Sequence, residues 1–241
     1  MPLPKHLEPK TFTCPVHGDY IGLVNRETGK QVGKCLLCKD VEWQAEQARK
    51  RIEHLFKISG IPALFSDKGL TDYQADNEQQ AKALSQARRF ADNHPANPLA
   101  SLIFTGATGT GKTHLAIGII RTLINQGKSC KYTTSYDLLS SIKATYGNES
   151  FRTEEDIVND YIKPSLIAID EAGMNELSKT DSNLLYRIIN GRYVENKGTV
   201  IVSNADLSLL KQNLGDRIVD RLRAGNSTLI DINCSSYRTK G

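Results

Sequence analysis

The sequence predicts an α/β protein whose five-stranded, mainly parallel sheet follows a small metal-stapled domain. From residue 76 onward, strand-like apolar runs alternate with helical patterns, as expected for a parallel sheet covered on both faces. The first of these strands leads into a glycine-rich loop at 106–113. Before residue 40, by contrast, three of the five cysteines crowd together with a nearby histidine.

Length and composition limit the classes of protein to consider. A chain of 241 residues can hold one full-sized core and a small satellite domain. The net charge of +4 permits contact with nucleic acid without arguing for it. No apolar run approaches the roughly 20 residues of a membrane helix, and the N-terminus lacks the apolar centre of a secretory signal. We therefore expect a cytoplasmic protein with no membrane partner, in which paired thiols bind metal more often than they form disulfides.

The stretches CPVHG and CLLCK place four potential metal ligands in two pairs. Two residues separate the members of each pair, and seventeen lie between the pairs, so that both pairs can reach one ion. Three thiolates and one imidazole suit Zn²⁺, and because the chain fills all four positions the site would be structural. The alternative is four unrelated residues in a disordered head. The predicted zinc ligands are Cys14, His17, Cys35 and Cys38.

A partial helical stripe follows, and Gly60 and Pro62 end it. The helix either packs on the zinc unit or docks on a partner. The segment between the two ligand pairs is rich in glycine and polar residues and is compatible with a short hairpin. The stripe consists of Trp43, Ala48, Ile52, Leu55 and Phe56.

The rest of the chain alternates between helix and strand, starting with a helix over about 76–92. Predicted strands lie at 99–106, 129–134, 165–173, 199–205 and 227–233. Predicted helices lie at 111–127, 136–147, 155–162, 182–196 and 215–225. The expected organisation is a zinc-binding head at 1–57, a linker that begins the next domain at 58–75, and the α/β domain at 76–241.

The loop GATGTGKTH carries the complete phosphate-binding signature, correctly flanked by a strand and a helix. Its glycines let backbone N–H groups close on the phosphates of ATP, and the start of the following helix favours negative charge. Lys112 should reach the β- and γ-phosphates, and the hydroxyl of Thr113 should hold Mg²⁺. The predicted ATP-binding residues of the loop are Gly106, Ala107, Thr108, Gly109, Thr110, Gly111, Lys112, Thr113 and His114.

The run LIAIDE ends a buried strand in two acids. We expect Asp170 to complete the Mg²⁺ shell of the bound nucleotide, and Glu171 to activate a water for attack on the γ-phosphate. A kinase would need a phosphate-accepting substrate there instead. The strand at 199–205 ends in Ser203 and Asn204, and Asn204 is expected to sense the γ-phosphate and help hold the water, with an ordinary strand-end turn residue as the alternative.

Five motifs in this order resemble the AAA+ helicase loaders of the DnaC type: GATGTGKTH, LIAIDEAG, IVSNADL, LGDRIVDRLRAGNS and SSYR. The resemblance runs over about residues 58–238. The same motifs are also similar, less closely, to those of the IstB-type transposition helper ATPases. The resemblance implies an ASCE-type sheet with the strand at 199–204 between those at 102–106 and 166–170. Only eight residues follow the last strand, so we expect no separate helical lid. The zinc-binding head departs from the best-known bacterial loader and is nearer to zinc-bearing relatives.

The resemblance also implies roles for three arginines. It assigns an arginine finger, which acts on the ATP of a neighbouring subunit, to Arg221 first and Arg217 second. These two lie four residues apart and share one helix face, so an ion-paired surface helix is the alternative. Arg238 resembles the family's second sensor of the nucleotide, with a solvated tail arginine as the alternative.

The resemblance also implies contacts with single-stranded DNA in the helical insertion SYDLLSSIKATYGNES at 135–150. There Lys143 would neutralise a phosphate and Tyr146 would stack on a base one helical turn away. An ordinary amphipathic helix with one exposed ring is the alternative. Ser178 and Thr180 are weaker candidates for the same role.

The leading hypothesis is an accessory ATPase that binds a replicative hexameric helicase through its head, assembles into an AAA+ oligomer, and delivers the helicase to single-stranded DNA. The implied cofactors are ATP, Mg²⁺ and Zn²⁺. A transposition helper that binds duplex DNA and recruits a transposase is the alternative ATPase. A pure adaptor with a vestigial site is disfavoured by the intact Lys112, Asp170 and Glu171, and a nucleoside kinase by the second-sensor and DRIVDR patterns. No motif assigns a residue to the adenine base.

Overall fold

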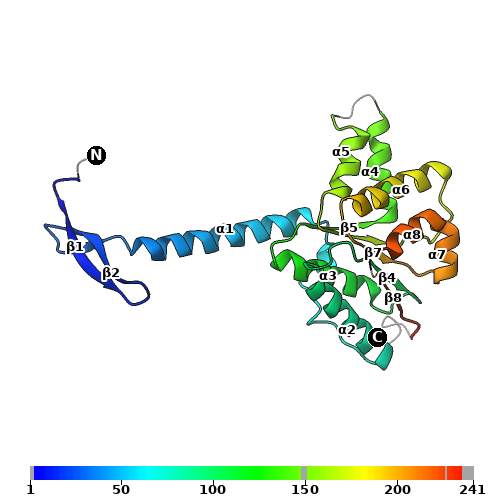
Figure 1. The fold of residues 1–241 in the computed structure, drawn as a ribbon, viewed down its shortest axis with the longest axis horizontal. Helices are drawn as coiled ribbons and strands as arrows, with labels where there is room; N and C mark the ends of the chain where they lie inside the picture. Colours follow the sequence, from blue (N-terminus) through cyan, green and yellow to red (C-terminus); the bar gives the residue numbers. More distant parts are fainter. Residues whose placement is uncertain (1–2, 148–150, 226, 235–241) are drawn as a thin grey trace. The chain divides into compact units, whose positions relative to one another are not determined.

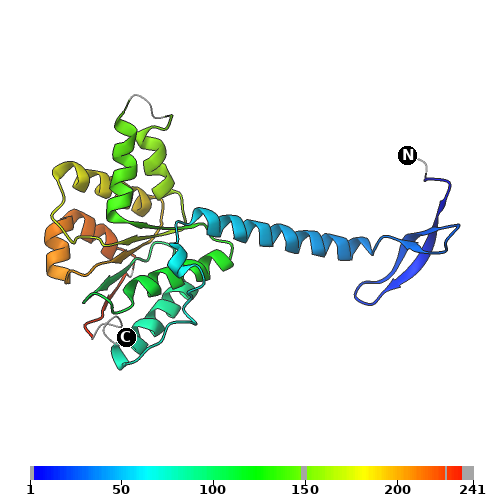
Figure 2. The same cartoon turned by 180° about the vertical axis from the view of Figure 1, so that it is seen from behind.

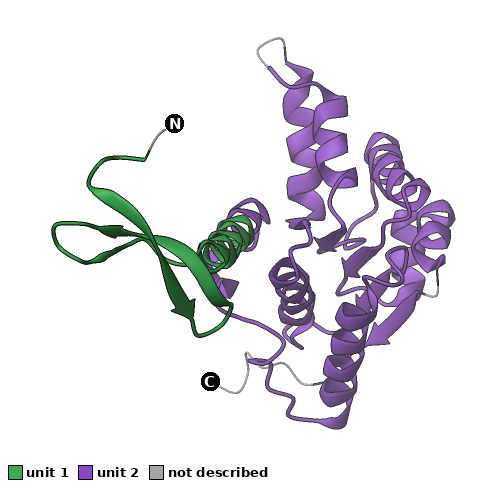
Figure 3. Ribbon diagram, turned by 60° about the vertical axis from the view of Figure 1, so that its left-hand side comes forward, with its two compact units in different colours: residues 1–53 green, residues 54–241 purple. Residues whose placement is uncertain are grey.

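The computed structural model describes residues 3–147, 151–225 and 227–234 (Figure 1). The chain forms two compact units, coloured separately in Figure 3. The division falls after Glu53, whereas the sequence analysis expected a boundary after residue 57. Arg238, the expected second sensor, lies outside the described residues.

The first unit contains a small antiparallel sheet followed by most of a long helix. The sheet comprises β1 (Leu7–Cys14), β2 (Gly18–Asn25) and β3 (Gln31–Val32) in the order β1-β2-β3, and the helix is α1 (Leu36–Ile58). The expected hairpin between the two ligand pairs is present as β2 and β3. The strand β1 was not predicted, because seven of its eight side chains are not buried and leave no hydrophobic alternation to detect.

The first unit has very little apolar core. Among its described residues, only Cys14, Val24 and Cys35 are buried apolar side chains, and two of these three are predicted metal ligands. Trp43 in α1 is 65 % exposed, so this residue of the predicted stripe does not pack on the zinc unit. A unit this small needs a source of stability other than hydrophobic burial, such as a bound metal ion.

The second unit is built on a five-stranded sheet in which all neighbouring strands are parallel. The order β5-β6-β7-β4-β8 places β7 between β4 and β6, as the sequence analysis expected. All residues of the three central strands are buried, which explains their continuous apolar runs. The strands are β4 (Leu102–Thr105), β5 (Cys130–Thr134), β6 (Leu166–Asp170), β7 (Thr199–Val202) and β8 (Thr228–Asp231).

Helices cover both faces of this sheet (Figures 1 and 2). On one face lie α2 (Glu78–Asn93) and α3 (Lys112–Asn125). On the other lie α4 (Ser135–Lys143), α5 (Glu154–Ile162), α6 (Lys179–Val194), α7 (Leu207–Leu214) and α8 (Asp216–Arg223). The alternate strand residues Ile103, Ile167, Ile169 and Ile201 join the core under this second group.

Most predicted elements of the second unit are present, with three differences. The helix α7 was not predicted, and neither was the short 3₁₀ turn η1 (Ala63–Phe65). The helix expected at 136–147 ends at Lys143 and continues as a 3₁₀ turn, η2 (Ala144–Tyr146). Among the described residues, no helix follows β8. No helix anywhere in the described ranges has both the length and the apolar character that a membrane span requires.

A fully buried arginine ties the amino ends of β6 and β7 together. Arg192, at the end of α6, is 0 % exposed, and burial lowers its pKa to about 9. Its guanidinium has no carboxylate partner among the described residues and is satisfied by main-chain carbonyls and one hydroxyl. The acceptors are the carbonyls of Tyr161, Ile162, Pro164, Ser165 and Gly198 and the hydroxyl of Thr199.

We expect Arg192→Ala to lower the free energy of unfolding by about 3 kcal/mol or more, because it leaves buried carbonyls unsatisfied and opens a cavity. Urea unfolding followed by circular dichroism measures this. The control is Arg187→Ala on the same helix, whose side chain is 44 % exposed in a surface ion pair with Glu154 and should cost less than about 1 kcal/mol. Equal losses in the two variants would contradict the assigned role.

Candidate functional site

The candidate site lies at the carboxyl end of β4, where the glycine-rich loop leads into α3. Gly106 has φ +118°, and a Cβ there would lie 2.2 Å from the carbonyl oxygen of Ile232. Gly111 has φ +93°, and a Cβ there would lie 2.7 Å from the ring of Tyr73. Only glycine fits such backbone without strain, so the predicted loop is built by its glycines.

The ammonium of Lys112 lies inside this loop. It donates to the carbonyls of Gly106 at 2.9 Å and Ala107 at 2.6 Å. Burial lowers the pKa of Lys112 from its usual value, and the carboxylate of Asp170 opposes this effect. A phosphate in the loop would take the place of these carbonyls as the partner of the charge, which is the predicted role of this lysine.

The carboxylate of Asp170 accepts three hydrogen bonds at the end of β6. Its Oδ2 accepts from the hydroxyl of Thr113 at 2.7 Å and from the hydroxyl of Tyr132 at 2.8 Å. Its Oδ1 accepts from the backbone N–H of Glu171 at 2.7 Å. Hard oxygen ligands of this kind suit Mg²⁺, so Thr113 and Asp170 fit the predicted ion. Burial, together with Asp170, raises the pKa of Tyr132, which keeps its hydroxyl protonated as a donor.

Glu171 has an unusual backbone conformation for its residue type. Its φ of +56° lies in the left-handed region, where a non-glycine residue is uncommon and costs free energy. The hydroxyl of Ser135, the first residue of α4, donates to the carbonyl of Glu171 at 3.0 Å. This conformation turns the chain sharply after β6 and leaves the Glu171 side chain exposed at a cavity beside the loop.

That cavity has a volume of about 550 Å³. Asn204, which follows β7, lines this cavity, whereas the hydroxyl of its buried neighbour Ser203 donates a hydrogen bond to the carbonyl of Ala172 at 2.6 Å. The sequence-predicted residues that line the cavity are Thr108, Gly109, Thr110, Gly111, Lys112, Thr113, His114, Asp170, Glu171 and Asn204.

Part of the cavity lining comes from residues 58–75, the segment expected as a linker that begins the α/β domain. Its lining residues include the apolar or aromatic Leu64, Phe65 and Tyr73. The hydroxyl of Tyr73 donates to the carbonyl of Thr110 at 3.1 Å, and His114 Nε2 lies 2.9 Å from the carbonyl oxygen of Gly69. The sequence analysis assigned no role to Leu64, Phe65 or Tyr73. The available signal was the presence of apolar and aromatic residues in the connecting segment 58–75.

Comparison with known proteins agrees with this geometry. The family model described as "IstB-like ATP binding protein" matches residues 34–241. The chain belongs to this family. The family resemblance stated from the sequence is therefore confirmed, and membership of the IstB-like family implies that the chain binds ATP.

Two relatives of this IstB-like chain carry the same name. It is 34 % identical to the replicative helicase loader DnaC of Buchnera aphidicola subsp. Baizongia pistaciae (strain Bp), over 99 % of this chain and 92 % of that protein. It is also 34 % identical to the replicative helicase loader DnaC of Escherichia coli (strain K12), over 82 % of this chain and 80 % of that protein.

Two solved structures share the α/β fold of this chain and confirm the predicted five-stranded, parallel sheet. A crystal structure of the DnaC helicase loader matches with a TM-score of 0.65 and 24 % identity, covering 71 % of this chain and 100 % of that one. A crystal structure of DnaI matches with a TM-score of 0.62 and 21 % identity, covering 76 % of this chain and 98 % of that one. At these identities the structures show the shared fold alone.

Arg217 and Arg221 of the IstB-like chain do not line the nucleotide cavity. Each guanidinium lies over a tyrosine ring of α6, Arg217 over Tyr186 at 4.1 Å and Arg221 over Tyr193 at 4.6 Å. The Nε of Arg221 also donates to Oδ1 of Asn190 at 3.0 Å. Neither arginine forms an ion pair with a carboxylate of the described residues, so the alternative of an ion-paired surface does not describe these two side chains.

The predicted DNA-binding residues also lie away from the cavity. Lys143 forms an ion pair with Asp181 at 2.7 Å, and Tyr146 in η2 is exposed. Partial burial, and a hydrogen bond with Glu154, raise the pKa of Tyr146. Ser178, a weaker candidate, caps α6 by accepting from the backbone N–H of Asp181.

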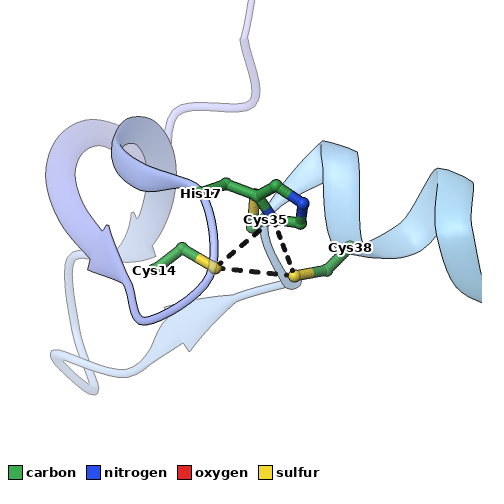
Figure 4. Close-up of side chains that lie close together, drawn as sticks. All are labelled: Cys14, His17, Cys35 and Cys38. Carbon is green, nitrogen blue, oxygen red and sulfur yellow. Dashed lines mark hydrogen bonds between the residues drawn. The ribbon is translucent and has the colours of Figure 1, made fainter.

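In the first unit, the four predicted metal ligands converge (Figure 4). One pair flanks the turn from β1 to β2, and the other spans the start of α1. Donor atoms are separated by 3.3 Å (Cys38–His17), 3.5 Å (Cys14–Cys38), 3.7 Å (Cys14–His17) and 3.9 Å (Cys35–His17). Tetrahedral zinc, with bonds of about 2.3 Å to sulfur and about 2.0 Å to nitrogen, requires donor separations of about 3.5–3.8 Å. Two of these four separations lie within that range and the other two lie close to it, so small shifts would let the cluster hold such an ion.

The two closest thiols are electrostatically different. Hydrogen bonds from the backbone of Val16 and His17 lower the pKa of Cys14 to about 6. The hydrogen bond between Cys38 and Cys14 raises the pKa of Cys38 to about 11. A bound cation would favour loss of the proton from both thiols.

Proposed function

We propose that this chain is an ATP-hydrolysing helicase loader, which binds a replicative hexameric helicase and single-stranded DNA and delivers one to the other. The observation that carries the proposal is a complete nucleotide site in a chain similar, over almost its whole length, to proteins named replicative helicase loaders. Lys112, Thr113, Asp170 and Glu171 meet beside one cavity.

In the proposed reaction, each side chain of the cavity has one task. Lys112 pairs with the β- and γ-phosphates, while Thr113 and Asp170 hold Mg²⁺, which neutralises phosphate charge. Glu171 accepts a proton from the attacking water, and Asn204 helps to orient that water. The base of ATP packs against Leu64, Phe65 and Tyr73, since these supply the apolar and aromatic surface of the cavity.

The first unit is proposed to carry one structural Zn²⁺ and to contact the helicase. Converging ligands and a nearly absent apolar core support the metal. Exposed apolar side chains at the start of α1 support a protein partner, because they are not buried within the chain. These side chains are Leu36, Leu37, Val41 and Trp43.

Single-stranded DNA is proposed to contact the end of α4 and η2. The exposed ring of Tyr146 offers a stacking surface, and Lys143 offers a positive charge. The Lys143 ammonium already pairs with Asp181, so a DNA phosphate would have to share or replace that carboxylate. Stacking on Tyr146 therefore makes the larger proposed contribution.

Arg221 is proposed to act as the arginine finger in an oligomer, with Arg217 as the second candidate. Their guanidiniums rest on tyrosine rings without a carboxylate partner among the described residues, so their charge is available to a phosphate of another subunit. Neither lines the cavity of its own chain, which favours action in trans.

Loading is tested with the full chain, the replicative helicase of the same organism and circular single-stranded DNA. We expect the wild-type protein with ATP to leave the helicase bound to the circles. Lys112→Ala should fail because it binds nucleotide weakly, and Glu171→Gln should bind ATP but hydrolyse it at least about 100-fold more slowly, since it lacks the general base. Retention of helicase on circles and release of phosphate are the measurements.

The matched control is Glu176→Gln, the same chemical change on an exposed side chain of the same connection that does not line the cavity. It should behave as wild type.

The family description names the IstB-like proteins, and a transposition helper is therefore the second candidate function. Binding of duplex DNA with recruitment of a transposase, and no retained helicase, would contradict the loader.

For the head, we expect one Zn²⁺ per chain in freshly purified protein, measured by elemental analysis. Cys35→Ser should lose the ion and make residues 1–53 sensitive to protease, while ATP binding by the second unit persists, because that unit has its own core. Cys234→Ser, outside the cluster, should keep its zinc. Wild-type protein without zinc would rule the proposal out.

For the finger, we expect hydrolysis to rise steeply with protein concentration. Arg221→Ala should bind ATP normally but hydrolyse it about 10³-fold more slowly, since it no longer stabilises transition-state charge. Mixing it with Lys112→Ala, which keeps the arginine, should restore activity at mixed interfaces. Arg223→Ala, exposed at the end of the same helix, is the control. Wild-type turnover by Arg221→Ala under assembling conditions would refute the assignment.

A further inference from the structure

A buried tyrosine contacts the proposed Mg²⁺ site from a strand with no assigned role. The hydroxyl of Tyr132, in β5, donates to Oδ2 of Asp170 at 2.8 Å. Thr113 donates to the same oxygen at 2.7 Å from the opposite side of the site, the start of α3. The sequence motif around Tyr132, SCKYTT, contributed only a strand to the sequence analysis.

The strand register explains why a tyrosine is needed. In the parallel pair of β5 and β6, Tyr132 lies opposite Ala168, while Thr134 lies opposite Asp170. Side chains two residues apart on one strand point to the same face, so Tyr132 and the carboxylate of Asp170 share a face but lie one repeat apart. A shorter hydroxyl side chain at position 132 would not reach Asp170.

The main chain of Tyr132 is fixed as well. Its N–H donates to the carbonyl of Ser59 at 2.7 Å, which pairs the outer edge of β5 with the segment after α1. Gly60 lies so close that a Cβ there would be 2.5 Å from the carbonyl oxygen of Tyr132. Tyr132 as a whole is 8 % exposed, and its buried hydroxyl finds its hydrogen-bond acceptor in the carboxylate of Asp170.

These contacts restrict the rotation of one carboxylate. Thr113 and Tyr132 hold Oδ2 of Asp170 from two different elements, and the N–H of Glu171 holds Oδ1. With Tyr132 removed, a single side-chain donor would remain on Oδ2, and Thr113 is itself a proposed ligand of the ion. Partners of this kind orient metal-ligating carboxylates and tune their affinity for the metal.

We propose that Tyr132 is a positioning residue of the Mg²⁺ site, holding the carboxylate of Asp170 in the orientation that binds the ion and its water shell. This inference rests on the proposed ATPase function. Tyr132 does not line the 550 Å³ cavity, so its effect passes through Asp170 and not through contact with the nucleotide. Nucleotide affinity without the metal should therefore be independent of its hydroxyl.

The test measures binding of a fluorescent ATP analogue to the full chain, in EDTA and across a Mg²⁺ titration. Tyr132→Phe should bind the analogue as wild type does in EDTA, which also shows that the site is folded. The Mg²⁺ concentration that produces half of the metal-dependent gain in affinity should rise about 10-fold, the lower end of the effect of losing such a partner.

The matched control is Tyr161→Phe. Tyr161 is also a buried tyrosine, 5 % exposed, and its hydroxyl lies 2.9 Å from that of Ser141, away from the nucleotide cavity. Its loss should leave the Mg²⁺ dependence unchanged. In an Asp170→Asn background, Tyr132→Phe should cause no additional change, because its effect requires the carboxylate.

The outcomes separate this inference from the proposed function. A wild-type protein that does not bind the ATP analogue more tightly with Mg²⁺ would overturn both. A wild-type protein that responds to Mg²⁺, with a Tyr132→Phe variant that follows the same titration curve, would overturn the positioning role alone. An equal change in Tyr161→Phe, or a full additional effect in the Asp170→Asn background, would also overturn it.

Discussion

The hydrogen bond between the hydroxyl of Thr113 and the carboxylate of Asp170 joins the two halves of the nucleotide site. Thr113 stands at the start of α3, after the glycine-rich loop, and Asp170 ends a central strand of the sheet. The bond therefore sets the distance between the element that holds phosphate and the element that holds the acids. Glu171 follows at once, and its left-handed backbone, tied to Ser135, directs its side chain to the cavity. The positions of these groups depend on the position of β6 in the sheet. The burial of the apolar side chains of β6 fixes that position.

The two units of the chain reach stability in different ways. The second unit buries an apolar layer on each side of a parallel sheet, and the guanidinium of Arg192 satisfies the main-chain carbonyls where β6 and β7 begin. The first unit has almost no such core among its described residues, and two of its three buried apolar side chains are cysteines of the cluster. A bound metal would replace the missing hydrophobic free energy there. The head can thus present apolar side chains to a partner without using them for its own folding.

Charged groups on the second unit serve different surfaces. Lys112 is buried within the loop and faces the site of its own chain, whereas Arg217 and Arg221 rest on tyrosine rings of α6 and do not line that site. Stacking on a ring holds a guanidinium in place without neutralising it, as a carboxylate would. The arrangement suits the proposed role of these arginines, in which hydrolysis depends on a neighbouring copy of the chain.

The sequence by itself determined the fold class, the strand order through its family resemblance, and nearly every group at the nucleotide site, because GATGTGKTH and LIAIDE are local patterns whose chemistry depends on spacing along the chain. It also identified the four side chains that converge in the head, since each pair is local. Only the tertiary structure placed Leu64, Phe65 and Tyr73 on the wall of the cavity, and Tyr132 on Asp170, because these contacts join segments separated by tens of residues and leave no period or motif. It likewise showed that Lys143 already has a carboxylate partner, which comes from a different helix, and that α7 exists. Local chemistry is written in neighbouring residues, whereas the pairing of distant side chains is decided by how the sheet and its helices pack.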